Sequence, residues 1–215
     1  HVLIRDKLYD EGFTKTFTDM PLLVRLDSKR RLKAEEVKEL SEKAKELKAK
    51  IPAYRELFVA VDKTGKLVIV DPRRLELVDP VTGERYDPVL EGEFEVELTD
   101  GGKVKVKPVF QLLKELVMRD YTPEKVARII SPKPELAPKY VEVIERLARD
   151  IATIKPVAII YGASNWQYYN GDLKGRALSL LVALTGNIGK PGSGISTYAG
   201  VYKIRWPMWS WWGYD

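Results

Sequence analysis

YGASNWQYYNGDLKGRALSLLVALTGNIGKPGSG, from Tyr161 to Gly194, is the stretch that decides the fold. It overlaps the end of KPVAIIYG (155–162), a run of small and β-branched residues that closes with glycine and is typical of a buried parallel strand. After an irregular loop, a helix is expected to begin at Gly171, with Asp172 as its N-cap, and to end at Gly186. Strand, glycine, loop and helix in this order are typical of the ligand-binding edge of an open α/β sheet, where a helix N-terminus favours anions.

The loop between this strand and this helix holds the candidate binding residues. Its polar side chains suit a phosphate group or a polar heterocycle, and glycines flank them. The set is Gly162, Ser164, Asn165, Gln167, Asn170 and Gly171. The spacing is neither GxGxxG nor GKS/T, so neither the dinucleotide fingerprint nor the phosphate-loop motif is present. From these residues alone two interpretations stay open: contact with a cofactor, and a packing unit whose Asn and Gln side chains satisfy loop backbone groups.

Outward from this segment, the chain divides into three parts. Residues 57–72 hold two β-rich runs around a turn at 62–65, and residues 92–110 alternate apolar and charged residues on both sides of a turn at 99–102. Both patterns predict antiparallel hairpins. We therefore expect a small antiparallel β insertion at 53–107. It lies between a helix–strand–helix part of an α/β body at 1–52 and the remainder of that body at 108–215. The predicted fold class is α/β, with an open, largely parallel sheet flanked by helices.

Helical patterns flank the β insertion on both sides. The first runs from Val2 to Phe17, with a break or bend at Gly12. A second, KAEEVKELSEKAKELKAK (33–50), lacks glycine and proline and is rich in good helix formers. Downstream, Thr122 is an expected N-cap with proline at the first helical position, and the strongest helical pattern covers 139–154.

Composition excludes several classes of site. The chain has 215 residues, a formal net charge of +5 and a pI of about 9.1. Basic and acidic residues are interspersed, which indicates an ion-paired surface rather than a nucleic-acid face and would suit a thermophile. There is no cysteine and the only histidine is His1, which excludes disulfides, cysteine-bound clusters and histidine metal sites within these residues. No stretch is apolar over the roughly 20 residues that a membrane-spanning helix needs.

Two longer motifs identify a family that the chain resembles. Gly162, Gln167 and Gly171 have the spacing G-x-x-x-x-Q-x-x-x-G, and LTGNIGKPG (184–192) ends the helix that follows. Both resemble the molybdenum bis(molybdopterin guanine dinucleotide) oxidoreductases, the dimethyl sulfoxide reductase superfamily. The opening HVLIRDKLYDEGFTKTFTDMPLLVRLD and a later stretch, KPVFQLLKELVMRDYTPEKVARI, are similar to the same catalytic subunits, so the resemblance covers nearly the whole chain. The nearest branch contains nitrate, selenate and chlorate reductases and ethylbenzene dehydrogenase.

The resemblance implies a catalytic subunit that binds molybdenum through molybdopterin guanine dinucleotides and transfers two electrons, for example to an oxyanion such as nitrate. The loop from Gly162 to Gly171 would line one pterin or its pyrophosphate. FTDMP (17–21), a loop before a strand by its sequence, would approach a substrate channel. The resemblance also implies a 4Fe-4S cluster in the parent chain and an iron–sulfur electron-transfer subunit. A possible membrane anchor subunit would associate the assembly with a membrane. The implied substrate is a small molecule, and no nucleic acid is expected as a partner.

Several parts of such a site have no counterpart in these residues. Nothing matches the cluster-binding motif, the molybdenum-ligating aspartate or the second dinucleotide site, and the chain opens at His1 inside an apolar pattern. We therefore expect a central fragment of a larger catalytic subunit, inactive alone. The tail RWPMWSWWGYD (205–215) is expected to be buried against the remaining polypeptide or a partner. The alternative is a cofactor-free structural or assembly subunit that keeps one α/β module.

Overall fold

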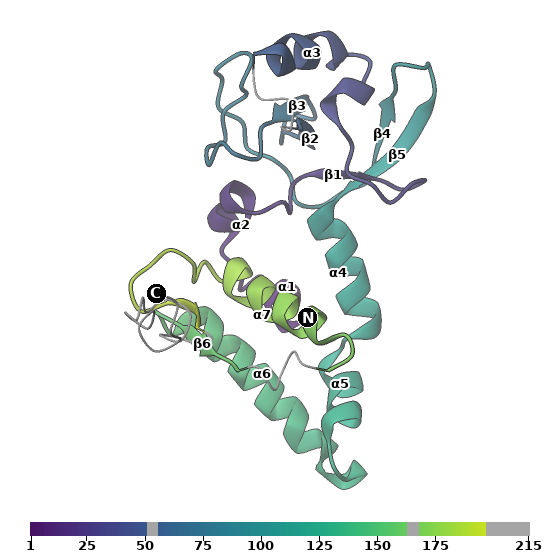
Figure 1. Cartoon of the computed structure of the whole chain (residues 1–215). Helices are drawn as coiled ribbons and strands as arrows, with labels where there is room; N and C mark the ends of the chain where they lie inside the picture. Colours follow the sequence, from purple (N-terminus) through teal and green to yellow (C-terminus); the bar gives the residue numbers. More distant parts are fainter. Residues whose placement is uncertain (51–55, 163–167, 197–215) are drawn as a thin grey trace, which may run out of the picture.

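The computed structural model describes residues 1–50, 56–162 and 168–196. Figure 1 shows two parts joined by α4 (Val109–Asp120): a strand-rich part above this helix and a helical part below it. Helices and strands are mixed along the chain, which confirms the α/β class. The described strands form two small antiparallel sheets and one parallel pair, so the open, largely parallel sheet stays a prediction.

Both predicted hairpins are present in the upper part (Figure 1). β2 (Phe58–Val61) pairs with β3 (Leu67–Val70), and β4 (Phe94–Glu97) pairs with β5 (Lys103–Pro108), in both cases antiparallel. β1 (Leu23–Arg25) pairs with the other edge of β5, which gives the sheet order β1–β5–β4. A strand that precedes the predicted insertion therefore completes one of its sheets.

One hydrophobic core holds the two antiparallel sheets together. Burial alternates along β5, where Val104 and Val106 are buried while Lys103 and Lys105 are exposed, as expected for a sheet with one solvated face. The core combines strand residues with residues 32–44, and its members include Leu23, Leu32, Val37, Ala44, Leu57, Val59, Ile69 and Val96. The core takes members from both sides of the proposed boundary at residue 52, and the division into three parts stays a prediction.

The helix predicted at 33–50 is shorter than expected. Only α3, Ser41–Ala49, is α-helical, and Ala34–Glu36 forms a single 3-10 turn, η1. The reason is a competing partner in the neighbouring hairpin, because the Lys38 amide donates a hydrogen bond to the Glu97 carbonyl at 3.1 Å. Helix propensity is a weak preference, and this tertiary contact overrides it.

The predicted break in the first helix lies before Gly12 rather than at it. α1 spans Val2–Arg5 and α2 spans Glu11–Phe17. Asp10 caps α2, since its carboxylate accepts a hydrogen bond from the Phe13 amide at 2.9 Å. The cap starts a new helix at Glu11 and leaves the glycine inside the first turn.

The lower part is helical, and the fully buried ring of Phe110 near the start of α4 packs with residues of α1 and α7. The members of this part besides α1 and α4 are α5 (Pro123–Ile130), the 3-10 turn η2 (Pro134–Leu136), α6 (Ala137–Thr153) and α7 (Gly171–Leu184). α5 and α6 form the helical hairpin at the bottom of Figure 1. Thr122 caps α5 as predicted, because its hydroxyl accepts a hydrogen bond from the Lys125 amide at 3.3 Å.

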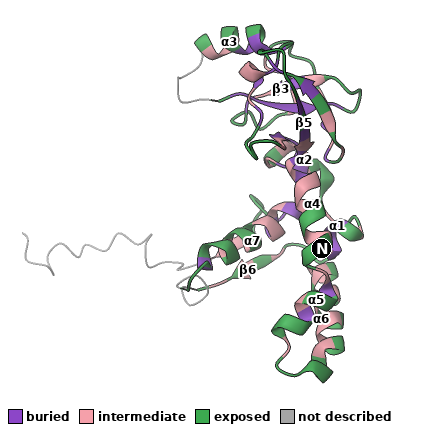
Figure 2. Ribbon diagram, turned by 90° about the vertical axis from the view of Figure 1, so that its right-hand side faces the viewer, coloured by how far each residue is buried: buried purple, intermediate pink, exposed green. Residues whose placement is uncertain are grey.

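Burial differs sharply between the two parts. Figure 2 shows buried strands in the upper part, whereas α5 and α6 are largely exposed or half-buried. α6 has no buried residue; Leu147 on it is 55% exposed, and Ile154, just after it, is 62% exposed. Exposed apolar area on this scale is typical of a surface that another polypeptide covers. Within the described ranges, no helix is both long and apolar enough to cross a membrane.

Candidate functional site

The glycine-punctuated segment forms a strand–helix–strand unit. β6 (Ala158–Ile160) runs parallel to β7 (Gly194–Ser196), and α7 lies between them in the chain. The predicted order of strand and helix is confirmed, and residues 163–167 of the loop between them lie outside the described residues. The predicted burial of the strand is wrong, since Ile160 is 83% exposed. The physical reason is that β6 and β7 pair only with each other among the described strands.

The structure describes half of the candidate binding residues. Those that lie outside the described ranges are Ser164, Asn165 and Gln167. Gly162 and Asn170 are exposed at the two ends of the loop between β6 and α7. Gly171 is the first residue of α7 and is buried. Asn170, with φ of 59°, is the N-cap of α7 in place of the predicted Asp172, and its side chain makes no capping hydrogen bond. α7 begins at Gly171, as expected, and Asp172 lies in its first turn.

The N-terminal end of α7 combines polar backbone with exposed aromatic side chains. Tyr168 and Tyr169 are 67% and 95% exposed, and a Cβ built at Gly162 would meet nothing within 4 Å. The Gly171 amide donates to the Tyr168 carbonyl at 2.8 Å and the Leu173 amide to the Asn170 carbonyl at 3.1 Å, and the N-terminal end of a helix carries partial positive charge. This end of α7 can therefore hold an anionic group with a flat ring system beside it.

The C-terminal end of α7 is closed by the glycine predicted there. Gly186 has φ of 64°, and its amide donates to the Ala183 carbonyl at 3.1 Å. The Asn187 amide donates to the Val182 carbonyl at 2.8 Å. These two hydrogen bonds form a Schellman motif, which confirms Gly186 as the residue that ends the helix.

Two buried polar residues beside this glycine were not among the sequence candidates. Thr185 and Asn187 are each 1% exposed. The Thr185 carbonyl accepts a hydrogen bond from the Lys155 ammonium. Burial lowers the pKa of Lys155, and the nearby Lys190 charge lowers it further. The signal that could have identified them is the T-G-N sequence itself, in which polar residues flank a helix-ending glycine.

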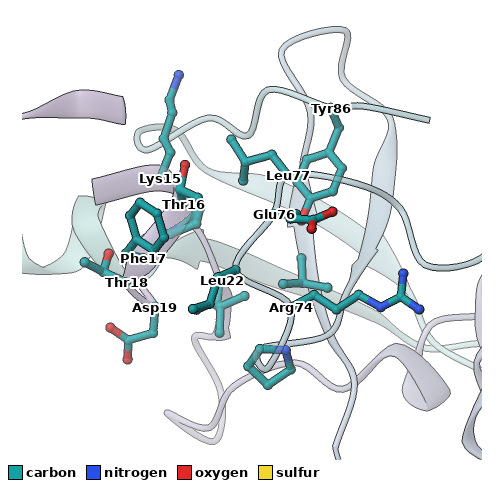
Figure 3. A pocket seen from close by; sticks show the side chains of 14 residues that line it. Lys15, Thr16, Phe17, Thr18, Asp19, Leu22, Arg74, Glu76, Leu77 and Tyr86 are labelled. Carbon is teal, nitrogen blue, oxygen red and sulfur yellow. The ribbon is translucent and has the colours of Figure 1, made fainter. Parts of the chain in front are cut away.

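A cavity of about 190 Å³ lies in the upper part, between the end of α2 and the loop after β3. Figure 3 shows Phe17 and Leu22 on one side of it and Leu77 and Tyr86 on the other. The loop 17–21, which the resemblance brings near a substrate channel, contributes to its wall. Burial raises the pKa of Tyr86 to about 12, so its phenol is neutral at physiological pH.

The described residues offer no metal centre of their own. They contain no group of three or more His, Cys, Asp or Glu side chains that could hold a metal ion. The described residues therefore place exposed aromatic and polar groups at one end of α7 and a buried polar junction at the other.

Comparison with known proteins places the chain among large redox enzymes. No family model matches it. The perchlorate reductase subunit alpha of Dechloromonas aromatica is 35% identical over 222 residues, which cover 94% of this chain and 22% of that protein. The respiratory nitrate reductase subunit alpha of Haloferax mediterranei is 32% identical, with 97% of this chain and 20% of that protein covered. The chlorate reductase subunit alpha of Ideonella dechloratans is 30% identical, with 93% and 19% covered.

The chain spans about a fifth of the length of these curated relatives. The matches nevertheless cover nearly all residues of this chain, and the covered part includes both motifs at 162–192. With identities of 30% to 35% along its length, the chain belongs to the family of molybdopterin oxidoreductase catalytic subunits.

Proposed function

We propose that the chain is part of the catalytic subunit of a molybdenum-dependent oxidoreductase that transfers two electrons to an oxyanion. The observation that carries this proposal is the match, over 94% and 97% of the chain, to alpha subunits of a perchlorate reductase and a respiratory nitrate reductase. The chlorate reductase relative adds a third oxyanion reductase. Nitrate, chlorate and perchlorate are therefore the substrates to test first.

The proposed cofactor is molybdenum bis(molybdopterin guanine dinucleotide), which supplies the two-electron redox chemistry when bound. The N-terminal end of α7 fits the anionic part of such a group, because the helix starts behind the exposed Asn170 and Gly162 leaves room for close approach. Tyr168 and Tyr169 offer exposed ring surface for a pterin or guanine. The residues proposed to contact it are Gly162, Asn170 and Gly171, together with Ser164, Asn165 and Gln167.

Other parts of the proposed site belong to further polypeptide. The chain has no cysteine, and its described residues hold no cluster of metal ligands. We propose that the protein ligand of molybdenum and a 4Fe-4S cluster lie in the remainder of the catalytic subunit, of which this chain matches about a fifth. An iron–sulfur electron-transfer subunit and a possible membrane anchor subunit complete the proposed assembly, which would be membrane-associated through them.

The open, largely parallel sheet is proposed to extend from β6 and β7. Parallel sheets are normally covered on both faces, and a two-stranded sheet is marginally stable by itself. The exposed side chain of Ile160 supports the proposal, because a further layer would bury it. In this arrangement the hairpins of 53–107 are an insertion into a body made of 1–52 and 108–215.

The test is purification of the full-length subunit from cells grown with molybdate. We expect stoichiometric molybdenum, pterin fluorescence after oxidation, and oxidation of reduced viologen that depends on nitrate, chlorate or perchlorate. The matched control is the same protein from cells that cannot synthesise molybdopterin, which should show none of the three. A stably folded subunit from normal cells that contains neither metal nor pterin would contradict the proposal and support the cofactor-free assembly role.

A further inference from the structure

Three chain segments meet at the C-terminal end of α7: the start of α2, the entry to β6 and the turn after α7 itself. The Asp10 amide donates a hydrogen bond to the Leu184 carbonyl at 2.7 Å. The Lys155 ammonium donates to the next carbonyl, that of Thr185. The last carbonyls of a helix have no partner within it, and here two segments distant in sequence supply partners.

Asn187 links the turn after α7 to the entry of β6. It is 1% exposed, and its Oδ1 accepts a hydrogen bond from the Val157 amide at 3.2 Å. Its Nδ2 donates to the Thr185 hydroxyl at 2.8 Å. The Val157 carbonyl in turn accepts from the Gly194 amide at 3.0 Å, at the start of β7. One buried side chain therefore ties the residue before β6 to the end of α7.

Close packing at two glycines strengthens the same junction. A Cβ at Gly186 would lie 2.5 Å from the Asp10 carboxylate, and one at Gly192 would lie 3.3 Å from the ring of Pro156. Both glycines also have positive φ. The motif LTGNIGKPG thus has a physical reason that involves no direct contact with a ligand.

The two elements that meet at this junction also lead to the two ends of the candidate loop, 162–171. β6 ends at Ile160, just before Gly162, and α7 runs as one helix from Gly171 to Leu184. Since a helix rises about 1.5 Å per residue, α7 is roughly 21 Å long, and a tilt of about 5° at the junction would move its other end by about 2 Å. A misplacement of about 1 Å in a reacting geometry can cost on the order of 100-fold in rate.

We propose that Asn187 is a positioning residue for the candidate site at the opposite end of α7. Its two side-chain hydrogen bonds hold β6 and α7 at a fixed distance and angle, and thereby fix Gly162 and Gly171 relative to each other. This inference rests on the proposed function, because only a group bound at that turn makes the spacing matter for a reaction. An asparagine with a purely structural role would change stability alone.

The test compares three variants in the full-length holoenzyme. Asn187→Leu keeps the approximate size of the side chain but removes both hydrogen bonds, and Thr185→Val removes only the hydroxyl partner. Val106→Ala, at a fully buried position of β5 far from α7 in Figure 1, is the control for lost stability. The measurements are thermal unfolding, molybdenum content, the Mo(V) electron paramagnetic resonance spectrum, kcat and KM, and hydrogen exchange of amides 168–173.

We expect Asn187→Leu to lower kcat by on the order of 10- to 100-fold with KM changed by less than about threefold. It should also shift the Mo(V) spectrum and speed exchange at 168–173, with Thr185→Val intermediate. Val106→Ala should lose thermal stability without any of these changes. The inference is overturned if Asn187→Leu, like Val106→Ala, loses thermal stability without any change in kcat, the Mo(V) spectrum or exchange at 168–173. If the leucine variant does not fold, Thr185→Val supplies the same comparison.

The two proposals fail in distinguishable ways. If the purified wild-type subunit contains no molybdenum, the proposed function is overturned. Hydrogen exchange at amides 168–173 in the wild type and in Asn187→Leu then decides the positioning role by itself. A wild-type enzyme with molybdenum and oxyanion reduction, in which Asn187→Leu changes neither the Mo(V) spectrum nor this exchange, overturns only the inference about Asn187.

Discussion

At Gly186 the absence of a side chain keeps two distant segments in contact. We expect Gly186→Ala to destabilise the protein by roughly 2–4 kcal/mol, because alanine is strained in the left-handed region and its Cβ would lie 2.5 Å from the Asp10 carboxylate that caps α2. Gly65→Ala is the matched control, since Gly65 also has positive φ but a Cβ there meets nothing within 4 Å. Denaturant unfolding measures both variants, and equal losses would contradict the contact with Asp10.

The Asp62 carboxylate makes the stability of the first hairpin sensitive to acid. Hydrogen bonds from the Thr64 hydroxyl, and from the Asp87 and Thr64 amides, lower its pKa to about 2. A carboxylate with a lowered folded pKa stabilises the fold above its unfolded pKa of about 3.9, and this contribution is lost as the pH falls toward 2. We expect Asp62→Asn to flatten the loss of stability between these values, measured by unfolding at stepped pH.

Thr64→Ala is the control for this prediction. It removes the hydrogen bond from the hydroxyl but keeps the carboxylate and both amide donors. Its acid sensitivity should therefore lie between those of the wild type and Asp62→Asn. Identical pH profiles for wild type and Asp62→Asn would show that the carboxylate does not carry the effect.

Sequence reasoning works at the residue scale where the information is local. Gly186 could be predicted because a helix-ending glycine reflects the conformation of its own backbone. Asn187 could not be identified as a buried link, because its partner Val157 lies far away in the sequence. The sequence predicts Asp172 as the N-cap where the structure has Asn170, since acidic caps are common and a left-handed cap leaves little trace in sequence.

At the scale of elements, the cap of α5 is the clearest local signal that the structure confirms. Thr122→Ala removes the acceptor of the Lys125 amide, and we expect it to cost about 1 kcal/mol. The loss should appear as faster hydrogen exchange at Val126 and Ala127. Thr153→Ala is the control, because Thr153 donates to the Arg149 carbonyl on an exposed surface and should change stability by less than about 0.5 kcal/mol. Similar exchange in both variants would contradict the capping role.

Elements were predictable where turns and alternation agreed, and unpredictable where a tertiary partner intervened. The hairpin β2–β3 follows from two apolar β-type runs around a glycine turn, and β4–β5 follows from alternating residues around another. The helix predicted at 33–50 lost its first half to contacts with the end of β4, which no local pattern reveals. The local sequence predicts β6 as a parallel strand, which the structure confirms, but the predicted burial fails because β6 pairs only with β7 among the described strands.

At the scale of the whole molecule, exposed apolar residues align along one face of the lower helical hairpin. Leu136, Val143, Leu147 and Ile154 are separated by seven, four and seven residues, which places them on the same side of the α6 region. Each is between 37% and 62% exposed. In keeping with the small share of its relatives that the chain covers, we propose that the remainder of the catalytic subunit packs on this face.

This proposal predicts a difference between two neighbouring substitutions on α6. In the full-length subunit, Leu147→Gln should lower stability by roughly 1.5–3 kcal/mol, the value of burying a leucine side chain, whereas the exposed Arg146→Gln should change it by less than about 0.5 kcal/mol. Thermal unfolding measures the difference, and hydroxyl-radical footprinting reports whether Leu147 is covered. Rapid labelling of Leu147 in the full-length subunit, with equal stability of the two variants, would show that this face stays open and that the remaining polypeptide packs elsewhere.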